Sequence, residues 1–179
     1  RGASYTAHHG QDAFFWSDPW FRGIDLIQSP DGGVFVADWS DVGECHEADG
    51  VHRSSGRIFK LTYGRPAPLK IKDVAALDAN ALIELHTHPN EWLSRQARHV
   101  LHEQAVAGKD ISAVQQGLKK IFADDPDSTH KLRALWTLHL ARGTTEAWIL
   151  EQLGHKDEHV RSWAVRLLTD QPPVSSAVV

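Results

Sequence analysis

Residues 88–101, HPNEWLSRQARHVL, align without gaps with residues 155–168, HKDEHVRSWAVRLL, and this repeat indicates how the second part of the chain folds. A weaker copy lies between them at residues 130–140. In each copy an alanine occupies the place where a small residue lets two helices approach closely. The three alanines follow one another at steps of 37 and 30 residues, which is typical of stacked helical repeats: Ala97, Ala134 and Ala164.

The segments between these copies also have helical patterns. Residues 111–122 and 145–153 carry apolar side chains at i, i+3 and i+4, and Asn90 and Asp157 stand where helix N-caps belong. We therefore predict that residues 72–172 form helix pairs stacked into a HEAT-like solenoid. The alternative is a tetratricopeptide arrangement, whose Trp/Gly/Tyr pattern is missing. One turn after the alanines, we expect buried leucines at Leu101, Leu138 and Leu168.

The composition changes near residue 65, where a strand-like part gives way to the helical part. Most of the glycines lie before this point, and Pro66 and Pro68 are typical of a linker that continues neither a strand nor a helix. We assign residues 1–65 to the first part, 66–71 to a linker and 173–179 to a tail.

The first part has the pattern of an antiparallel meander. Strands are expected over residues 23–28, 33–39 and 56–63, with a turn at 29–33 and a long loop at 40–55. An earlier strand is expected over residues 3–8. A sheet this small buries too little apolar surface to stand alone, so we predict one blade of an incomplete β-propeller. The fold class is α+β in two parts, the blade followed by the solenoid.

Composition excludes several classes of protein. Hydrophobic residues are 41% and charged residues 23%, which is ordinary for a globular chain. A net charge of −4 without a Lys/Arg cluster argues against a nucleic-acid partner, and no apolar run could span a bilayer. The single cysteine, Cys45, excludes an internal disulfide and a Cys-x-x-Cys-His haem site. Because the chain has no Met, we expect it to be a piece of a longer protein.

Three stretches of the first part carry a resemblance: DPWFRGIDL at 18–26, SPDGGVFVADW at 29–39 and GRIFKL at 56–61. They resemble the last blade of the planctomycete and verrucomicrobial "membrane-bound dehydrogenase domain" proteins, whose propellers are similar to soluble quinoprotein sugar dehydrogenases. In that family HEAT repeats follow the propeller, as LHTHPNEW at 85–92 does here. One departure is Gly23, where such sequences often have Pro.

The resemblance implies a function for the whole protein. It implies an exported, periplasmic or cell-envelope dehydrogenase that acts on sugars or alcohols, with pyrroloquinoline quinone or calcium as cofactor. The blade would pack against the rest of its own propeller, and the helical repeats would bind protein partners. This chain alone would be inactive, because one blade cannot enclose a cofactor. The alternative is a non-catalytic propeller/HEAT protein that binds proteins or glycans, so enzymatic activity stays open.

The meander topology selects candidate site residues. Alternate connections emerge at the same edge of a meander, so residues 17–22 and 40–55 are expected to share one face. There Arg22 would supply a fixed cation and His46 a titratable group near neutral pH, and we name both as candidate catalytic residues. Oxygen ligands that could hold a divalent cation are Asp38, Asp41 and Glu47. Cys45 is a weaker candidate nucleophile.

Structural interpretations compete with these roles. Asp38 could cap a strand end, Arg22 could pair with a neighbouring acid, and Trp20 and Trp39 could pack between blades. In the helical part, His86 and His88 fall on different faces and are poor co-ligands. The second pair, His155 and His159, is expected to be a solvated pair at a helix end.

Overall fold

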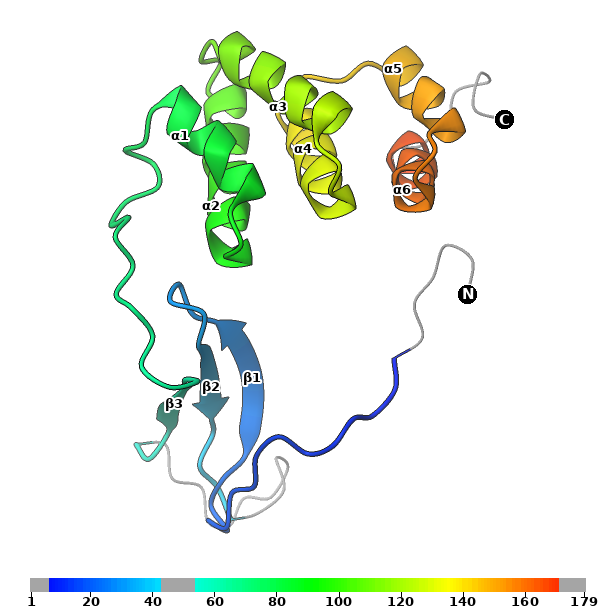
Figure 1. Cartoon of the computed structure of the whole chain (residues 1–179). Coiled ribbons are helices and arrows are strands. Elements are labelled where there is room, and N and C mark those ends of the chain that lie inside the picture. The colour runs from blue at the N-terminus through cyan, green and yellow to red at the C-terminus, as the bar shows by residue number, and fades with distance from the viewer. Residues whose placement is uncertain (1–6, 43–53, 171–179) are drawn as a thin grey trace. The chain divides into compact units, whose positions relative to one another are not determined.

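The computed structural model describes residues 7–42 and 54–170. The fold is α+β, a three-stranded antiparallel sheet followed by six α-helices. The chain forms two compact units, with the boundary between Lys70 and Ile71, and each unit is described by itself (Figure 1). Within the described residues, no helix is both long and apolar enough to cross a membrane.

The sheet is a meander of β1 (Gly23–Gln28), β2 (Val34–Asp38) and β3 (Arg57–Leu61), with β2 in the centre. The expected strands are therefore confirmed to within two residues at each end. The turn between β1 and β2 forms because Asp31 Oδ1 accepts hydrogen bonds from the Ser29 hydroxyl at 2.7 Å and the Gly33 N–H at 3.3 Å. At its tip Gly32 has a φ of +86°, which glycine adopts without steric cost.

The two faces of the sheet differ in what covers them. On one face Trp16 stacks on Phe21, with ring centroids 4.3 Å apart, and both rings lie against Phe59 from β3. On the other face Ile27 and Ile58 are 60% and 77% exposed. Among the described residues of this unit, Val36 is the one buried large apolar side chain. The sheet therefore buries little apolar surface of its own.

The helical unit consists of three hairpins, each with a first helix that leads into a second one. The first helices of the first and third hairpins are short and end in a 3₁₀ turn. The elements are α1 (Ala79–Glu84) with η1 (Leu85–Thr87), α2 (Glu91–Val106), α3 (Ser112–Asp124), α4 (Ser128–Leu140), α5 (Glu146–Glu151) with η2 (Gln152–Gly154), and α6 (Glu158–Thr169). The second helices are neighbours, since α4 contacts both α2 and α6 (Figure 1).

The second helices begin with the same pattern of capping hydrogen bonds. Their N-caps are Asn90, Asp127 and Asp157, and each side chain accepts a hydrogen bond from the backbone N–H two residues on. The N–H of each cap in turn donates to a side chain two residues earlier. These acceptors are His88 Nδ1 at 2.9 Å, Asp125 Oδ1 at 2.8 Å and His155 Nδ1 at 3.0 Å. The sequence therefore starts each second helix locally.

The predicted register of the repeat is confirmed by burial. Seven residues after each cap comes an alanine that is fully buried, and the leucine one turn further on is also buried. The alanines and leucines are Ala97, Ala134, Ala164, Leu101, Leu138 and Leu168.

Two elements differ from the sequence prediction. Helix α1 was not predicted, because six residues are too few to show a helical period; Asp78 caps it by accepting from the Ala81 N–H at 2.8 Å. Of the strand expected over residues 3–8, only 7 and 8 are described, and they are not in a strand. The tail at 173–179 lies outside the described residues.

Candidate functional site

The candidate site lies at the end of the sheet opposite the turn at 29–33, around the carboxylate of Asp38. Asp38 is buried. Its Oδ1 accepts from the backbone N–H of Arg22 at 2.7 Å and of Ser40 at 2.9 Å. Its Oδ2 accepts from Arg57 Nε at 2.6 Å. One carboxylate therefore ties together the entry into β1, the exit from β2 and the start of β3.

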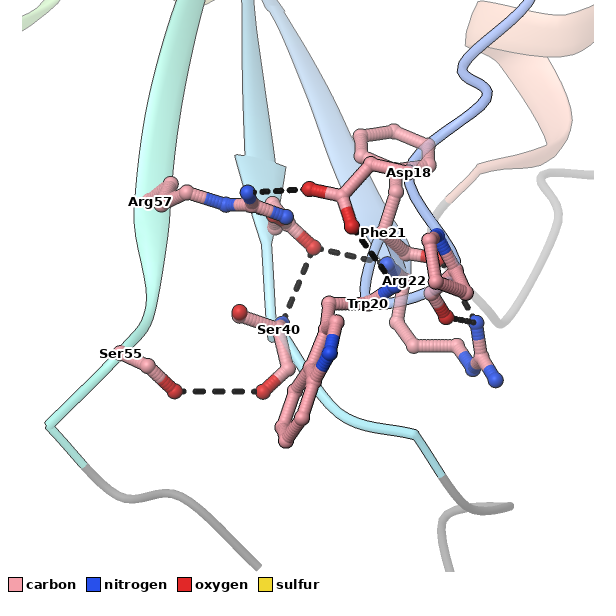
Figure 2. Close-up of polar contacts among 9 residues, drawn as sticks. Asp18, Trp20, Phe21, Arg22, Ser40, Ser55 and Arg57 are labelled. Carbon is pink, nitrogen blue, oxygen red and sulfur yellow. Dashed lines mark hydrogen bonds and ion pairs between the residues drawn. The ribbon is translucent and has the colours of Figure 1, made fainter.

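Arg57 joins a second carboxylate to this network. Its Nη1 lies 2.5 Å from Asp18 Oδ2, and Figure 2 shows the two side chains pointing toward each other. Asp18 is positioned by the Trp20 N–H, which donates to its other oxygen at 2.9 Å. The guanidinium carbon of Arg57 also lies 5.2 Å from the centre of the Phe59 ring. Arg57 is thus held by two acids and one aromatic ring.

Electrostatics keep all three groups ionised near neutral pH. The hydrogen bond to Asp18, and then the one to Asp38, raise the pKa of Arg57. The hydrogen bond from Arg57 is the main cause that lowers the pKa of Asp18. For Asp38, burial by itself raises the pKa, but the backbone N–H groups of Arg22 and Ser40 and the Arg57 guanidinium outweigh it, so the net pKa is lowered. The trio is a set of fixed charges and cannot exchange protons near neutral pH.

The guanidinium of Arg22 holds backbone carbonyls. Its Nη1 donates to the carbonyl oxygens of Pro19 at 3.0 Å and Phe21 at 2.9 Å, and its Nη2 donates to that of Val42 at 2.8 Å. These contacts join the segment before β1 to the segment after β2. The catalytic role of Arg22 stays a prediction, and the observed contacts are structural ones.

Asp41 reaches the same end of the sheet. Its N–H donates to the Trp20 carbonyl at 3.0 Å, and the preceding Ser40 has a φ of 57° in the left-handed region. Arg22, Asp38 and Asp41 therefore lie together at the end of the sheet opposite the turn, as the meander connectivity predicts.

The remaining members of the predicted site cannot be placed. His46 and Glu47, with Cys45, lie outside the described residues, so the catalytic role of His46 and the metal role of Asp38, Asp41 and Glu47 stay predictions. Within residues 7–42 and 54–170, no three His, Cys, Asp or Glu side chains are grouped so that they could hold a metal ion.

Asp18 and Arg57 are the residues that sequence reasoning underrated. Asp38 and Arg57 are directly opposite one another in the β2–β3 register. Opposite charges at cross-strand positions stabilise a sheet, so a closer pairing of the two strands from the sequence would have found Arg57. The meander connectivity places Asp18, in segment 17–22, at this end of the sheet, but it does not indicate the pairing with Arg57, which stands 39 residues further along the chain.

Two histidines of the helical unit, His86 and His155, have structural contacts. His86 is fully buried: its Nδ1 lies 2.9 Å from the Leu82 carbonyl oxygen and its Nε2 lies 2.9 Å from the Thr137 hydroxyl. Burial lowers the pKa of His86 to about 4, so the ring is neutral at physiological pH. The expectation that His155 is solvated at a helix end is wrong in part. Its ring is half-buried, accepts a hydrogen bond from the Asp157 N–H and lies 5.7 Å from the Phe122 ring.

Comparisons with known proteins add no assignment: no protein-family model, no curated protein and no solved structure matches the chain.

Proposed function

We propose that this chain is a binding module, in which the sheet is one blade of a larger β-propeller and the helical unit is a HEAT-like platform for a protein partner. The observation that carries the proposal is the apolar surface on the sheet. Leu26, on the partly covered face, is 68% exposed, and Ile27 and Ile58, on the open face, are exposed to a similar degree. Exposed apolar surface on both faces of one small sheet is typical of a layer that packs between other layers.

The charged groups of the sheet favour binding over catalysis. Asp38 is occupied by two backbone N–H groups and a guanidinium, and Arg57 is held between two acids. Arg22 is engaged with three carbonyl oxygens. A catalytic group needs an atom that can contact a substrate, and these atoms already hold the sheet together.

The helical unit supports a HEAT-like platform through its repetition. The second helices of the three hairpins, α2, α4 and α6, share one pattern of capping hydrogen bonds and one buried alanine position. They are also neighbours in space. Arg133 adds a link between hairpins, since its Nη1 donates to the carbonyl oxygens of His86 at 3.3 Å and His88 at 2.9 Å. A row of rigid helices of this kind offers a continuous surface to a partner.

The enzymatic alternative is an exported dehydrogenase-like propeller that acts on sugars or alcohols. It is favoured by the meeting of Arg22, Asp38 and Asp41 at the end of the sheet from which the segment carrying His46 departs. If it holds, His46→Ala in the full-length protein should reduce turnover far more than stability. The sequence of the full reading frame separates the enzyme from the binding module. A Cys-x-x-Cys-His motif and further blades would favour the enzyme.

Replacing Ile58 with Asp tests the blade proposal. In the 179-residue chain, Ile58 is exposed. Ile58→Asp should therefore reduce the association of the chain with itself and its binding of a dye that recognises apolar surface, without lowering the melting temperature. In a longer protein that contains the neighbouring blades, the same charge would be buried and should cost roughly 1–3 kcal/mol. Ser54→Asp, at an exposed position outside the strands, is the control and should change neither. Equal effects of Ile58→Asp in both proteins would show that the face is not covered.

A further inference from the structure

A groove of about 380 Å³ crosses the second helices of all three hairpins and lies wholly within the helical unit. Arg98 comes from α2 and Trp136 from α4, while Trp163 and Arg166 come from α6. The two tryptophans meet edge to face, with centroids 4.9 Å apart and ring planes at 63°. Apolar side chains complete the wall: Leu140 and Leu167.

The two arginines of this groove form no ion pair with a described residue, although one acid, Asp170, lines the groove with them. The guanidinium carbons of Arg98 and Arg166 lie 5.3 Å and 4.8 Å from the centres of the Trp136 and Trp163 rings. In the part of the chain that the structure describes, neither makes a hydrogen bond or an ion pair to a carboxylate. Near Arg98, Glu91 adds an opposite charge and Arg95 and Arg133 add like charge, but Glu91 already forms ion pairs with those two arginines. The groove therefore presents positive charge that an anion can neutralise.

Trp136 and Trp163 form the apolar wall of the groove together with the leucines. The indole Nε1 of Trp136 is itself buried and has no hydrogen-bond acceptor among the described residues, so the ring contributes its apolar surface. The groove thus combines two cations with an apolar wall.

We propose that this groove binds an acidic peptide segment, in which a carboxylate pairs with Arg98 or Arg166 and a neighbouring apolar side chain packs on Trp136 and Trp163. The inference rests on the proposed role of the helical unit as a platform, and it names the chemistry of the partner. Arg and Trp are the residues that most often dominate peptide and protein interfaces.

The geometry disfavours glycans and nucleic acids. Sugars and bases stack on open, flat aromatic faces, whereas each indole here has a guanidinium over one face and the two indoles meet edge to face. Asp170 also lines the groove and repels a ligand with a continuous row of negative charges. A peptide with a few spaced carboxylates avoids this repulsion.

Fluorescence anisotropy with a labelled nonapeptide of alternating Glu and Leu tests the proposal on the full chain. We expect saturable binding that weakens with salt and is lost when Gln replaces every Glu. Arg98→Gln and Arg166→Gln should each weaken binding about tenfold or more. Lys119→Gln removes one positive charge from α3, outside the groove, and should leave the affinity within about twofold. Arg166 is exposed, so its variant remains informative if Arg98→Gln unfolds.

Three results would overturn the inference. One is no anisotropy change up to about 1 mM peptide. Another is binding that Arg98→Gln and Arg166→Gln leave unchanged. A third is Arg-dependent binding of oligogalacturonate or single-stranded DNA in place of the peptide. None of these results bears on the blade, which the Ile58→Asp comparison tests separately.

Discussion

The two units of this chain are stabilised in different ways. The helical unit buries leucines and alanines at repeated positions, and each second helix carries its own cap. The sheet buries Val36 and is held at its two ends by charges, Lys60–Asp31 at the turn and Arg57 with its two acids at the other end. The helices therefore supply most of the stability of the chain, whereas the sheet depends on the ion pairs at its two ends and on what covers its faces.

The largest effect should come from opening the helical core. Leu138 is fully buried on α4, and Leu138→Ala should lower the free energy of unfolding by about 2–5 kcal/mol because it leaves a cavity. Leu140→Ala on the same helix, where the side chain is 42% exposed, should cost less than about 1 kcal/mol. Urea unfolding followed by far-ultraviolet circular dichroism measures both. Similar losses would show that α4 is not central to the core.

Acid should weaken the helical unit through His86. Its pKa is lowered from 6.5 to about 4 by burial, so the unfolded chain binds the extra proton first. Stability is therefore present above pH ~6.5 and declines as the pH falls toward about 4, by about 3 kcal/mol in all. Urea midpoints across this pH range measure the loss. In His86→Gln the slope should become shallower, and an unchanged slope would contradict the assignment.

Overpacking tests the repeat register. Ala134 is fully buried on α4, and Ala134→Leu should cost about 1–3 kcal/mol because the added atoms force the helices apart. The control is Ala113→Leu, the same change at an exposed position on α3, which should leave the melting temperature nearly unchanged. A melting temperature that Ala134→Leu does not lower would mean that the proposed register is wrong.

The smallest effect is expected in the sheet. Asp38→Asn keeps an acceptor for the Arg22 N–H but removes the charge that faces Arg57, and should weaken the sheet by about 1–2 kcal/mol. Hydrogen exchange should then speed up at the amides of Arg22 and β2 and stay constant in α4, which belongs to the other unit. Asp31→Asn, at the more exposed pair with Lys60, should have a smaller effect. Faster exchange in α4 would show that the units are not independent.

The sequence predicted much of the fold because its signals were local. The turn at 29–33 and the alternation around it located β1 and β2, and the repeat at 88–101 located the second helices. The six-residue helix α1 was not predicted, because so short a helix shows no period of apolar residues. For the candidate site, connectivity predicted that Arg22 and Asp38 meet at one edge, and the structure shows them in contact. The hydrogen bonds from the Arg22 guanidinium to backbone carbonyl oxygens were not predicted, because they depend on where the loops close.

Strands, helix caps and the repeated alanines could thus be located from the sequence, because strands and caps depend on neighbouring residues and the alanines recur in aligned segments. Which distant charges meet could not be located in this way, and the structure alone shows it. Asp18 reaches Arg57 across 39 residues, and the Arg98, Trp136 and Trp163 groove forms from three different helices. Such contacts depend on how the loops close and on which side chains of stacked helices face one another. The repeat indicates that the helices stack, but no spacing in the sequence indicates these individual contacts.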